Sequence, residues 1–202
     1  CNQSSPSIDG CTISYNKASG CGGGIYCERS SNPTITNCII KNNNNVFGPP
    51  DPYVYPPDDD PTGGGIFCYR SNPSIINSTI IQNKGGGVTV VSYSPVIITN
   101  SIIRNNSISQ IAGQVTATYS NIQGGWDGQG NIDIDPLLTC DGHLQAFSPC
   151  INVGDPCYVP APDETDIDGE SRISDGRLDM GSDEFADSDS DGLPDWWESK
   201  YF

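Results

Sequence analysis

Over the first 120 positions, apolar residues occur in short groups separated by turns rich in Asn, Gly and Pro. The order of these groups repeats. One recurring segment begins with an Asn-Pro or Ser-Pro turn, continues with alternating apolar residues and a β-branched pair, and ends with an Asn. Its copies are residues 32–43, 72–83 and 94–106, with a weaker copy at 5–16. A second recurring segment places three glycines before an apolar strand: residues 22–27, 63–68 and 85–90. Alternation with a period of two between turn residues predicts short β-strands, and no segment of the repeat has a helical pattern.

A repeat of this size cannot bury its own apolar face, so successive copies must stack. Coils stacked about 4.8 Å apart would place equivalent residues in register along the long axis. We therefore predict an all-β parallel β-helix over residues 1–120. Its inward ladders would be Ile13, Ile40, Ile80 and Ile103; Ile25, Ile66, Val88 and Val115; and Ile8, Ile35, Ile75 and Ile97. At one turn, Asn37, Asn77 and Asn100 would bond from coil to coil through their side-chain amides.

Cysteines follow the same repeat. Cys1, Cys27 and Cys68 precede three copies of one turn, and Cys11 aligns with Cys38. We interpret these five as small buried residues, with stacked disulfides as the alternative. In the later, loop-rich region a disulfide is expected between Cys150 and either Cys140 or Cys157.

The alignment of Cys1 with Cys27 predicts that the chain starts in the middle of a coil and that further coils precede it. A bare coil edge would pair with more coils or with another molecule, so end-to-end assembly into a homo-oligomer or filament is expected.

After residue 120 the repeat fades, and residues 121–186 form a separate closing module. The stretches 135–138, 142–154, 166–172 and 177–185 resemble the C-terminal segment of secreted bacterial right-handed parallel β-helix proteins. The resemblance implies right-handed coils, a loop-rich C-terminal cap and a secreted or cell-surface location. Relatives of this kind are joined to carbohydrate-active modules or to surface anchors.

Within the closing module we interpret five charged residues as a network of one arginine with carboxylates, the alternative being a second cation site. These residues are Asp166, Asp168, Arg172, Asp179 and Glu184. His143, the single histidine of the chain, is interpreted as structural, because no triad or metal site could be built around it from the sequence.

Charge is distributed unevenly along the chain. Residues 1–154 carry a net charge of −4 and residues 155–202 a net charge of −12, for a total of −16. No basic stripe is present that could replace the counterions of a phosphate backbone, which argues against nucleic-acid binding. No apolar run of about 18 residues occurs, so no transmembrane segment is predicted.

The last sixteen residues, 187–202, contain the most specific motif. Asp187, Asp189 and Asp191 are spaced two apart and Gly192 follows, which is the order of an EF-hand calcium loop. The loop also resembles the calcium repeats of dockerin and thrombospondin type 3 modules. The predicted Ca²⁺ ligands are Asp187, Asp189, Asp191, the Leu193 carbonyl, Asp195 and Glu198, and a helix is expected to start within this segment.

One coil is interrupted by a proline-rich insertion at residues 44–62. Its aromatic and acidic side chains are candidates for binding sugar rings, sugar hydroxyls or calcium, with packing as a lid as the favoured alternative. These candidates are Tyr53, Tyr55, Asp58, Asp59 and Asp60. Arg29 and Arg70 are expected to be stacked neighbours and are further candidates for a ligand-binding surface.

The sequence thus favours an extracellular structural or adhesive rod with a calcium-stabilised C-terminus, whose partners would be polysaccharides or other surface proteins. The alternative is a carbohydrate-active protein that binds polysaccharide or acts on it as a lyase or hydrolase. Parallel β-helices host such enzymes, but the coils lack a cluster of carboxylates and bases for this chemistry.

Overall fold

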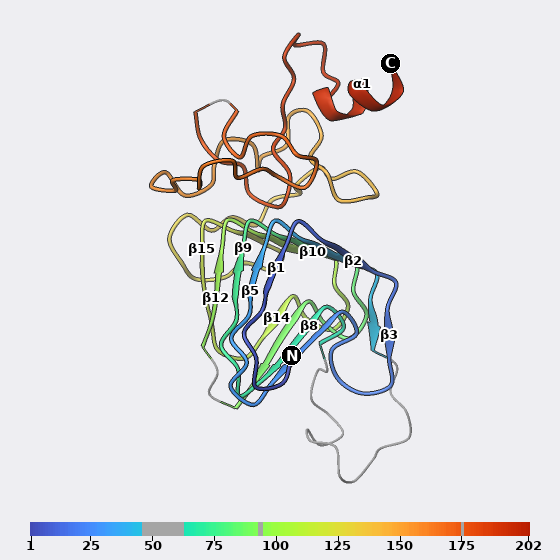
Figure 1. Ribbon diagram of the computed structural model, residues 1–202, viewed down its shortest axis with the longest axis vertical. Coiled ribbons are helices and arrows are strands. Elements are labelled where there is room, and N and C mark those ends of the chain that lie inside the picture. The colour runs from blue at the N-terminus through green and yellow to red at the C-terminus, as the bar shows by residue number, and fades with distance from the viewer. Residues whose placement is uncertain (46–62, 93–94, 175) are drawn as a thin grey trace.

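The computed structural model describes residues 1–45, 63–92, 95–174 and 176–202. In these residues sixteen short strands and one helix, α1 (Asp195–Tyr201), are present. All strand pairs are parallel, and the strands form three larger sheets and one short pair (Figure 1). The predicted all-β parallel β-helix is therefore confirmed.

The first sheet contains β1 (Ser7–Asp9), β5 (Thr34–Thr36), β9 (Ser74–Ile76), β12 (Val96–Thr99) and β15 (Val115–Thr118). The second contains β2 (Thr12–Ser14), β6 (Ile39–Lys41), β10 (Thr79–Ile81), β13 (Ile102–Arg104) and β16 (Asn121–Ile122). The third contains β4 (Ile25–Glu28), β8 (Ile66–Tyr69), β11 (Val88–Val91) and β14 (Ile111–Ala112). The short pair is β3 (Lys17–Ala18) with β7 (Asn44–Asn45). Each of the first four turns of the coil contributes one strand to each larger sheet, and the last turn contributes β15 and β16 to the first two.

The predicted ladders are correct at ten of their twelve positions and wrong at Ile97 and Val115. Ile98, not Ile97, pairs with Ile75; Ile98 is fully buried, whereas Ile97 is 52% exposed. Val115 pairs with Val96 in the first sheet, and Ile111 takes the place beside Val88. Both errors arise where coil length changes, so that an alignment made on the turn residues slips.

The asparagine ladder lies at a different turn from the one predicted. Side-chain amides bond from coil to coil through Asn16, Asn43, Asn83 and Asn106, at 2.9–3.1 Å. Asn37, Asn77 and Asn100 do occupy equivalent turn positions, but their side chains bond elsewhere, to Asp9, Tyr158 and the Asp155 amide. Their φ angles of 47–50° explain the choice of Asn, which tolerates the left-handed region better than most residues.

Glycine is required where the coils approach most closely. A Cβ on Gly64 would lie 1.9 Å from the carbonyl oxygen of Lys84 in the next coil, a separation that backbone atoms cannot relieve. The repeated glycine triplet therefore marks close contact between coils rather than a loop.

All nine cysteines are free, so the expected disulfide of Cys150 is absent. Cys27 and Cys68 are paired positions of adjacent strands and, like Cys38, are fully buried, as expected for small apolar residues of the interior. The expectation is wrong for Cys11, which is exposed, and Cys1 is only partly buried. Cys150 is also fully buried, whereas Cys140 and Cys157 are exposed.

Most of the closing module lies along the side of the coils, over the second sheet, as Figure 1 shows. Outward-facing Ile102 packs with Leu144, Cys150 and Met180, and a Cβ on Gly142 would contact Ile39 and Ile81. This contact explains the Ile-Ile pairs of the second sheet, at 39–40, 80–81 and 102–103, because one isoleucine of each pair faces the interior and the other lies on the side of the closing module.

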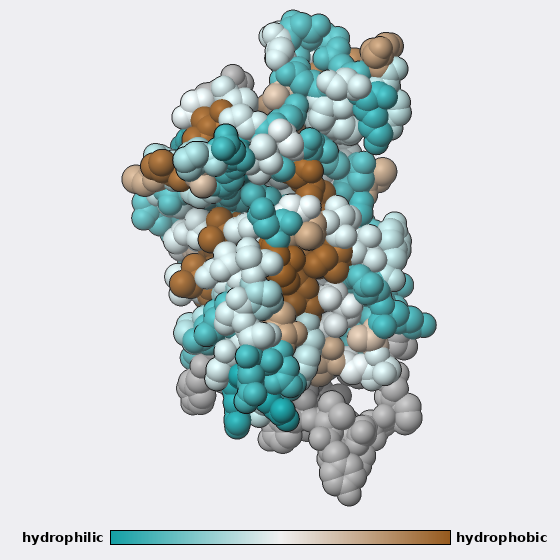
Figure 2. All heavy atoms as spheres, viewed as in Figure 1, coloured by the Kyte–Doolittle hydropathy of each residue, from teal (hydrophilic) through white to brown (hydrophobic). Residues whose placement is uncertain are grey.

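The two ends of the coil stack differ. Beyond β15 and β16, residues 124–132 close the stack: Trp126 packs against the core, and Ile122 donates to the Ile132 carbonyl at 2.9 Å. At the other end Ile8 and Ile13 are only partly buried. Figure 2 shows apolar side chains in the middle of the face where the N-terminal coil lies. In the part of the chain that the structure describes, no helix has the length and apolar character needed to cross a bilayer.

Candidate metal and ligand sites

The acidic tail folds into a compact loop. Carboxylate oxygens of Asp187, Asp189 and Asp191 lie within 4.8 Å of one another. Backbone amides hold them there: Gly192 donates to Asp187 at 2.9 Å, and Leu193 donates to Asp191 at 2.8 Å. Three convergent carboxylates repel one another unless a cation joins them, and hard oxygen ligands suit Ca²⁺.

The remaining predicted ligands are placed unequally around this loop. Glu198 lies in α1, and desolvation together with the charges of Asp189, Asp191, Asp195 and Asp187 raises its pKa. Asp195 instead accepts hydrogen bonds from the Ser188 amide, at 2.8 Å, and from its hydroxyl, at 2.5 Å. Leu193, 37% exposed, lies between Asp191 and Asp195 in the sequence.

The candidate ligand-binding residues Tyr53, Tyr55 and Asp58–Asp60 lie outside the described residues. Arg29 and Arg70 follow the paired positions Glu28 and Tyr69, so they occupy equivalent places in adjacent coils, and both are exposed. The Arg70 guanidinium lies 5.0 Å from the ring centre of Tyr69. This pair forms a small basic surface at one turn.

Two other bases of the coils are engaged in structural contacts. Lys41 donates to the Asp141 carbonyl at 2.9 Å, which ties β6 to the closing module. Arg104 forms an ion pair with Asp133 at 2.7 Å. Among the described residues, the groupings of His, Cys, Asp and Glu that could hold a metal ion all lie after residue 140.

Of the carboxylates assigned to a network around Arg172, the structure pairs only Glu184 with it; Asp168 lies against His143, and Asp166 and Asp179 accept from backbone amides. Arg172 is fully buried, lies 3.2 Å from Glu184 and donates to the Gly181 carbonyl at 3.3 Å. Gly181 in turn donates to the Asn100 carbonyl of the coils at 2.8 Å. Burial, followed by repulsion from Asp179, raises the pKa of Glu184 to about 9, and the Arg172 charge opposes this shift.

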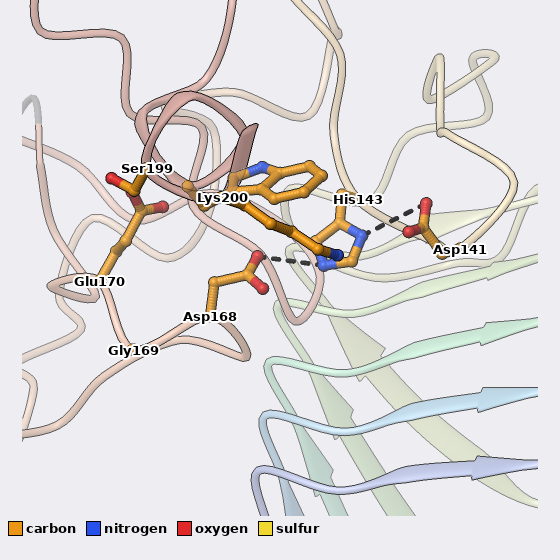
Figure 3. Close-up of a pocket in the computed structure, with 8 residues that line it drawn as sticks. Asp141, His143, Asp168, Gly169, Glu170, Ser199 and Lys200 are labelled. Atoms are coloured by element: carbon orange, nitrogen blue, oxygen red, sulfur yellow. Dashed lines mark ion pairs between the residues drawn. The ribbon is translucent and has the colours of Figure 1, made fainter. Parts of the chain in front are cut away.

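A pocket of about 300 Å³ lies between the closing module and α1, lined by Asp141, His143, Asp168, Gly169, Glu170, Trp196, Ser199 and Lys200. Figure 3 shows the His143 ring between two carboxylates: Nε2 is 3.0 Å from Asp168 and Nδ1 is 3.6 Å from Asp141. The Trp196 ring stacks over His143 with a centroid separation of 4.7 Å.

Neighbouring charges in this pocket shift the pKa values of His143 and Glu170. Burial acts to lower the pKa of His143, but the hydrogen bond and charge of Asp168, followed by Asp141, outweigh it and raise the pKa. Burial and the charges of Asp166 and Asp168 raise the pKa of Glu170 to about 7. The sequence does not predict this pocket, because the neighbours of His143 in space come from loops with no periodic relation to it.

A second hollow, of about 640 Å³, lies at the closed end of the coils and is lined by Val115, Gly124, Gly125, Trp126 and Asp127. Trp126 donates from its ring nitrogen to the Val115 carbonyl at 3.3 Å, which fixes the ring orientation. This tryptophan is not among the residues predicted from the sequence, although a Gly-Gly-Trp-Asp turn directly after the last repeat marks its position.

Comparison with known proteins agrees with this fold. Residues 2–122 match the family model described as a right-handed β-helix region. The match covers more than half of the chain, which therefore belongs to the right-handed β-helix family. No curated protein and no solved structure gives a significant match.

Proposed function

We propose that this chain is an extracellular structural β-helix rod whose C-terminal loop is stabilised by Ca²⁺. The observation that carries the proposal is the convergence of Asp187, Asp189 and Asp191. Their charges also raise the pKa of Glu198, which therefore lies near them. A loop of this kind has a use where Ca²⁺ is abundant, which supports a location outside the cell or at its surface.

The distribution of charged groups favours a structural role over catalysis. Lyase and hydrolase chemistry needs carboxylates or bases gathered on an outward face. Over the described coils, Asp9 accepts hydrogen bonds from Thr36 and Asn37, and Glu28 accepts them from Asn2 and Tyr26. These acids serve coil-to-coil contacts, so the coils provide a rigid surface for display or attachment.

Calcium binding is tested on the full chain by calorimetry after removal of metal with EDTA. We expect one Ca²⁺ to bind the tail with hydrogen-exchange protection appearing in residues 187–202. Asp189→Asn should weaken this binding at least about tenfold, because it removes one charged oxygen ligand. Asp135→Asn is the matched control, since this exposed acid lies outside the loop. Equal binding by the Asp189→Asn protein and the unmodified chain would contradict the proposal.

Glycan binding is a second candidate function, favoured by the hollow beside Trp126. Trp126 offers an aromatic face with Asp127 alongside, a combination suited to a sugar ring and its hydroxyls. The full chain is incubated with acidic and neutral polysaccharides, and bound protein and newly released sugar ends are measured together. Binding that is lost in Asp127→Asn, without released ends, would support a glycan-binding rod. Calcium-dependent release of ends would instead make the protein an enzyme.

A further inference from the structure

Three loops of the closing module bring an imidazole and two carboxylates together beside α1. A ring nitrogen of His143 and one carboxylate oxygen each from Asp168 and Asp183 lie within 4.8 Å of one another. These residues are far apart in the sequence and none belongs to the acidic tail. The group is therefore separate from the loop at residues 187–198.

The three loops are fixed to one another by hydrogen bonds. Leu144 donates to Asp183 Oδ2 at 2.7 Å, and Ile167 donates to the Ser182 carbonyl at 3.0 Å. The Asp168 amide donates to Asp166 Oδ1 at 2.9 Å, which shapes the turn that presents the Asp168 side chain. A geometry held by the backbone in this way exists before any ligand arrives.

Buried groups in this cluster lack partners. Asp183 is 1% exposed, and its Oδ1 atom is buried without a hydrogen-bond donor. His143 is 8% exposed, and its Nδ1 atom has no hydrogen bond within the usual distance. Burying a carboxylate beside a second carboxylate is unfavourable unless a cation compensates both. Burial and the charges of Asp166 and Asp168 raise the pKa of Asp183, as expected for such an arrangement.

We propose that His143, Asp168 and Asp183 bind a divalent metal ion of the zinc class. A nitrogen ligand with two carboxylates suits Zn²⁺, whereas Ca²⁺ takes six to eight oxygen ligands. Tetrahedral bonds of about 2.0–2.1 Å separate ligand atoms by roughly 3.4 Å. The 3.0 Å between His143 Nε2 and Asp168 therefore needs to widen only slightly.

Two neighbours complete the site. Asp141, 3.6 Å from His143 Nδ1, would accept the second ring proton once Nε2 binds the metal, an arrangement common for metal-bound histidines. The pocket leaves the remaining side open for water or a small ligand. Because Trp196 stacks on His143, metal binding also anchors α1 to the closing module.

The single histidine gives a direct test on the untagged full chain. Metal is removed, the tail is saturated with Ca²⁺, and Zn²⁺ is then added while the imidazole proton resonances of His143 are followed by NMR. We expect these resonances to move and to stop moving at one equivalent of Zn²⁺. Resonances that stay in place with Zn²⁺ in excess would overturn the proposal, whatever the behaviour of the tail.

Variants separate this site from the tail. Asp183→Asn keeps an oxygen that accepts from Leu144 while removing the charge, and we expect at least about 100-fold weaker Zn²⁺ binding for it and for His143→Gln. Asp141→Asn should weaken Zn²⁺ binding about 10-fold, as expected for a residue that orients a metal ligand. Asp189→Asn, in the tail, should bind Zn²⁺ as the unmodified chain does. Loss of Zn²⁺ binding in Asp189→Asn with retention in His143→Gln would assign the metal to the tail and overturn the proposal.

Discussion

Single side chains carry much of the cohesion between coils. Asn83 is 1% exposed, and its side chain makes four hydrogen bonds to neighbouring coils. Its oxygen accepts from the backbone amide and the side chain of Asn43, and its nitrogen donates to the Asn106 side chain and to the Ile40 carbonyl. Each buried polar group left unpaired costs about 1–3 kcal/mol. The buried asparagine ladder therefore contributes more to the free energy of unfolding than exposed hydrogen bonds of similar length.

Asn83→Ala is expected to lower the free energy of unfolding by about 3 kcal/mol, because the Asn43 amide loses its acceptor inside the coil stack. Urea denaturation measures the change. Asn2→Ala is the control, since Asn2 bonds Glu28 at an exposed position and should cost less than about 1 kcal/mol. Similar losses in both proteins would show that the ladder adds no special stability.

The cysteines make a second prediction at this scale. Burial raises the pKa of Cys38 and of Cys150 to about 11, so only about one thiol in a thousand is ionised at pH 8. We expect iodoacetamide to modify exposed Cys11, Cys140 and Cys157 in the folded protein, and Cys38 and Cys150 only after unfolding. Peptide mapping by mass spectrometry measures the order in which the cysteines are modified. Cys150 reacting as fast as Cys157 would contradict the buried position.

Among the elements, strand register is defined by distance from the asparagine turn rather than from the proline that precedes the strand. Ile75 and Ile98 each lie two positions before the turn residues Asn77 and Asn100. The coil after Pro95 contains one more residue before the position that pairs with Ile75, so counting from the proline selects Ile97. A one-residue slip moves a side chain to the other face of the strand.

Adjacent isoleucines provide the matched test. Ile98→Ala should destabilise the protein by about 2–5 kcal/mol, because it opens a cavity between coils. Ile97→Ala should cost less than about 1 kcal/mol, since this side chain is 52% exposed. Thermal denaturation of both proteins measures the difference. A larger loss for Ile97→Ala would support the register that the proline alignment predicts.

Much of the coil architecture could thus be predicted from the sequence, because a repeat reports the same environment several times. The closing module gave no such signal. Its position over the second sheet depends on single contacts, such as Ser182 with the Thr79 hydroxyl at 3.1 Å, that no periodicity marks. The approach of His143 to Asp183 likewise results from three irregular loops. The convergence of Asp187, Asp189 and Asp191 was visible in the sequence, because their spacing is itself the motif.

For the whole molecule, the coils and the acidic tail should respond differently to loss of calcium. The coils are held by apolar ladders and side-chain amides, whereas residues 187–202 contribute no buried residue from α1. Repeat proteins gain stability from neighbouring coils rather than from distant segments.

EDTA is therefore expected to remove hydrogen-exchange protection from residues 187–202 while the strands of the coils keep theirs. Exchange measured by mass spectrometry with and without Ca²⁺ tests this division. Loss of protection along the entire chain in one step would show that the metal supports the coils as well.

The edge formed by β1 and β2 presents unpaired backbone groups and partly buried Ile8 and Ile13. We expect another copy of this chain to pair there through one of its own coils. Light scattering across a concentration series, with Ile8→Lys as the disrupting variant, tests association between copies. If the unmodified chain and Ile8→Lys associate equally, copies of the chain do not pair through the edge formed by β1 and β2.

The recurrence of equivalent positions after 23 residues, between the third and fourth coils, has a genetic consequence. Ser78 and Ser101, and likewise Asn83 and Asn106, are equivalent positions separated by 23 residues. An in-frame loss or duplication of 23 codons in this stretch would remove or add one complete coil and leave every remaining interface in register. The length of such a rod can therefore change by unequal recombination in a single event, while its two ends and its acidic tail are inherited intact.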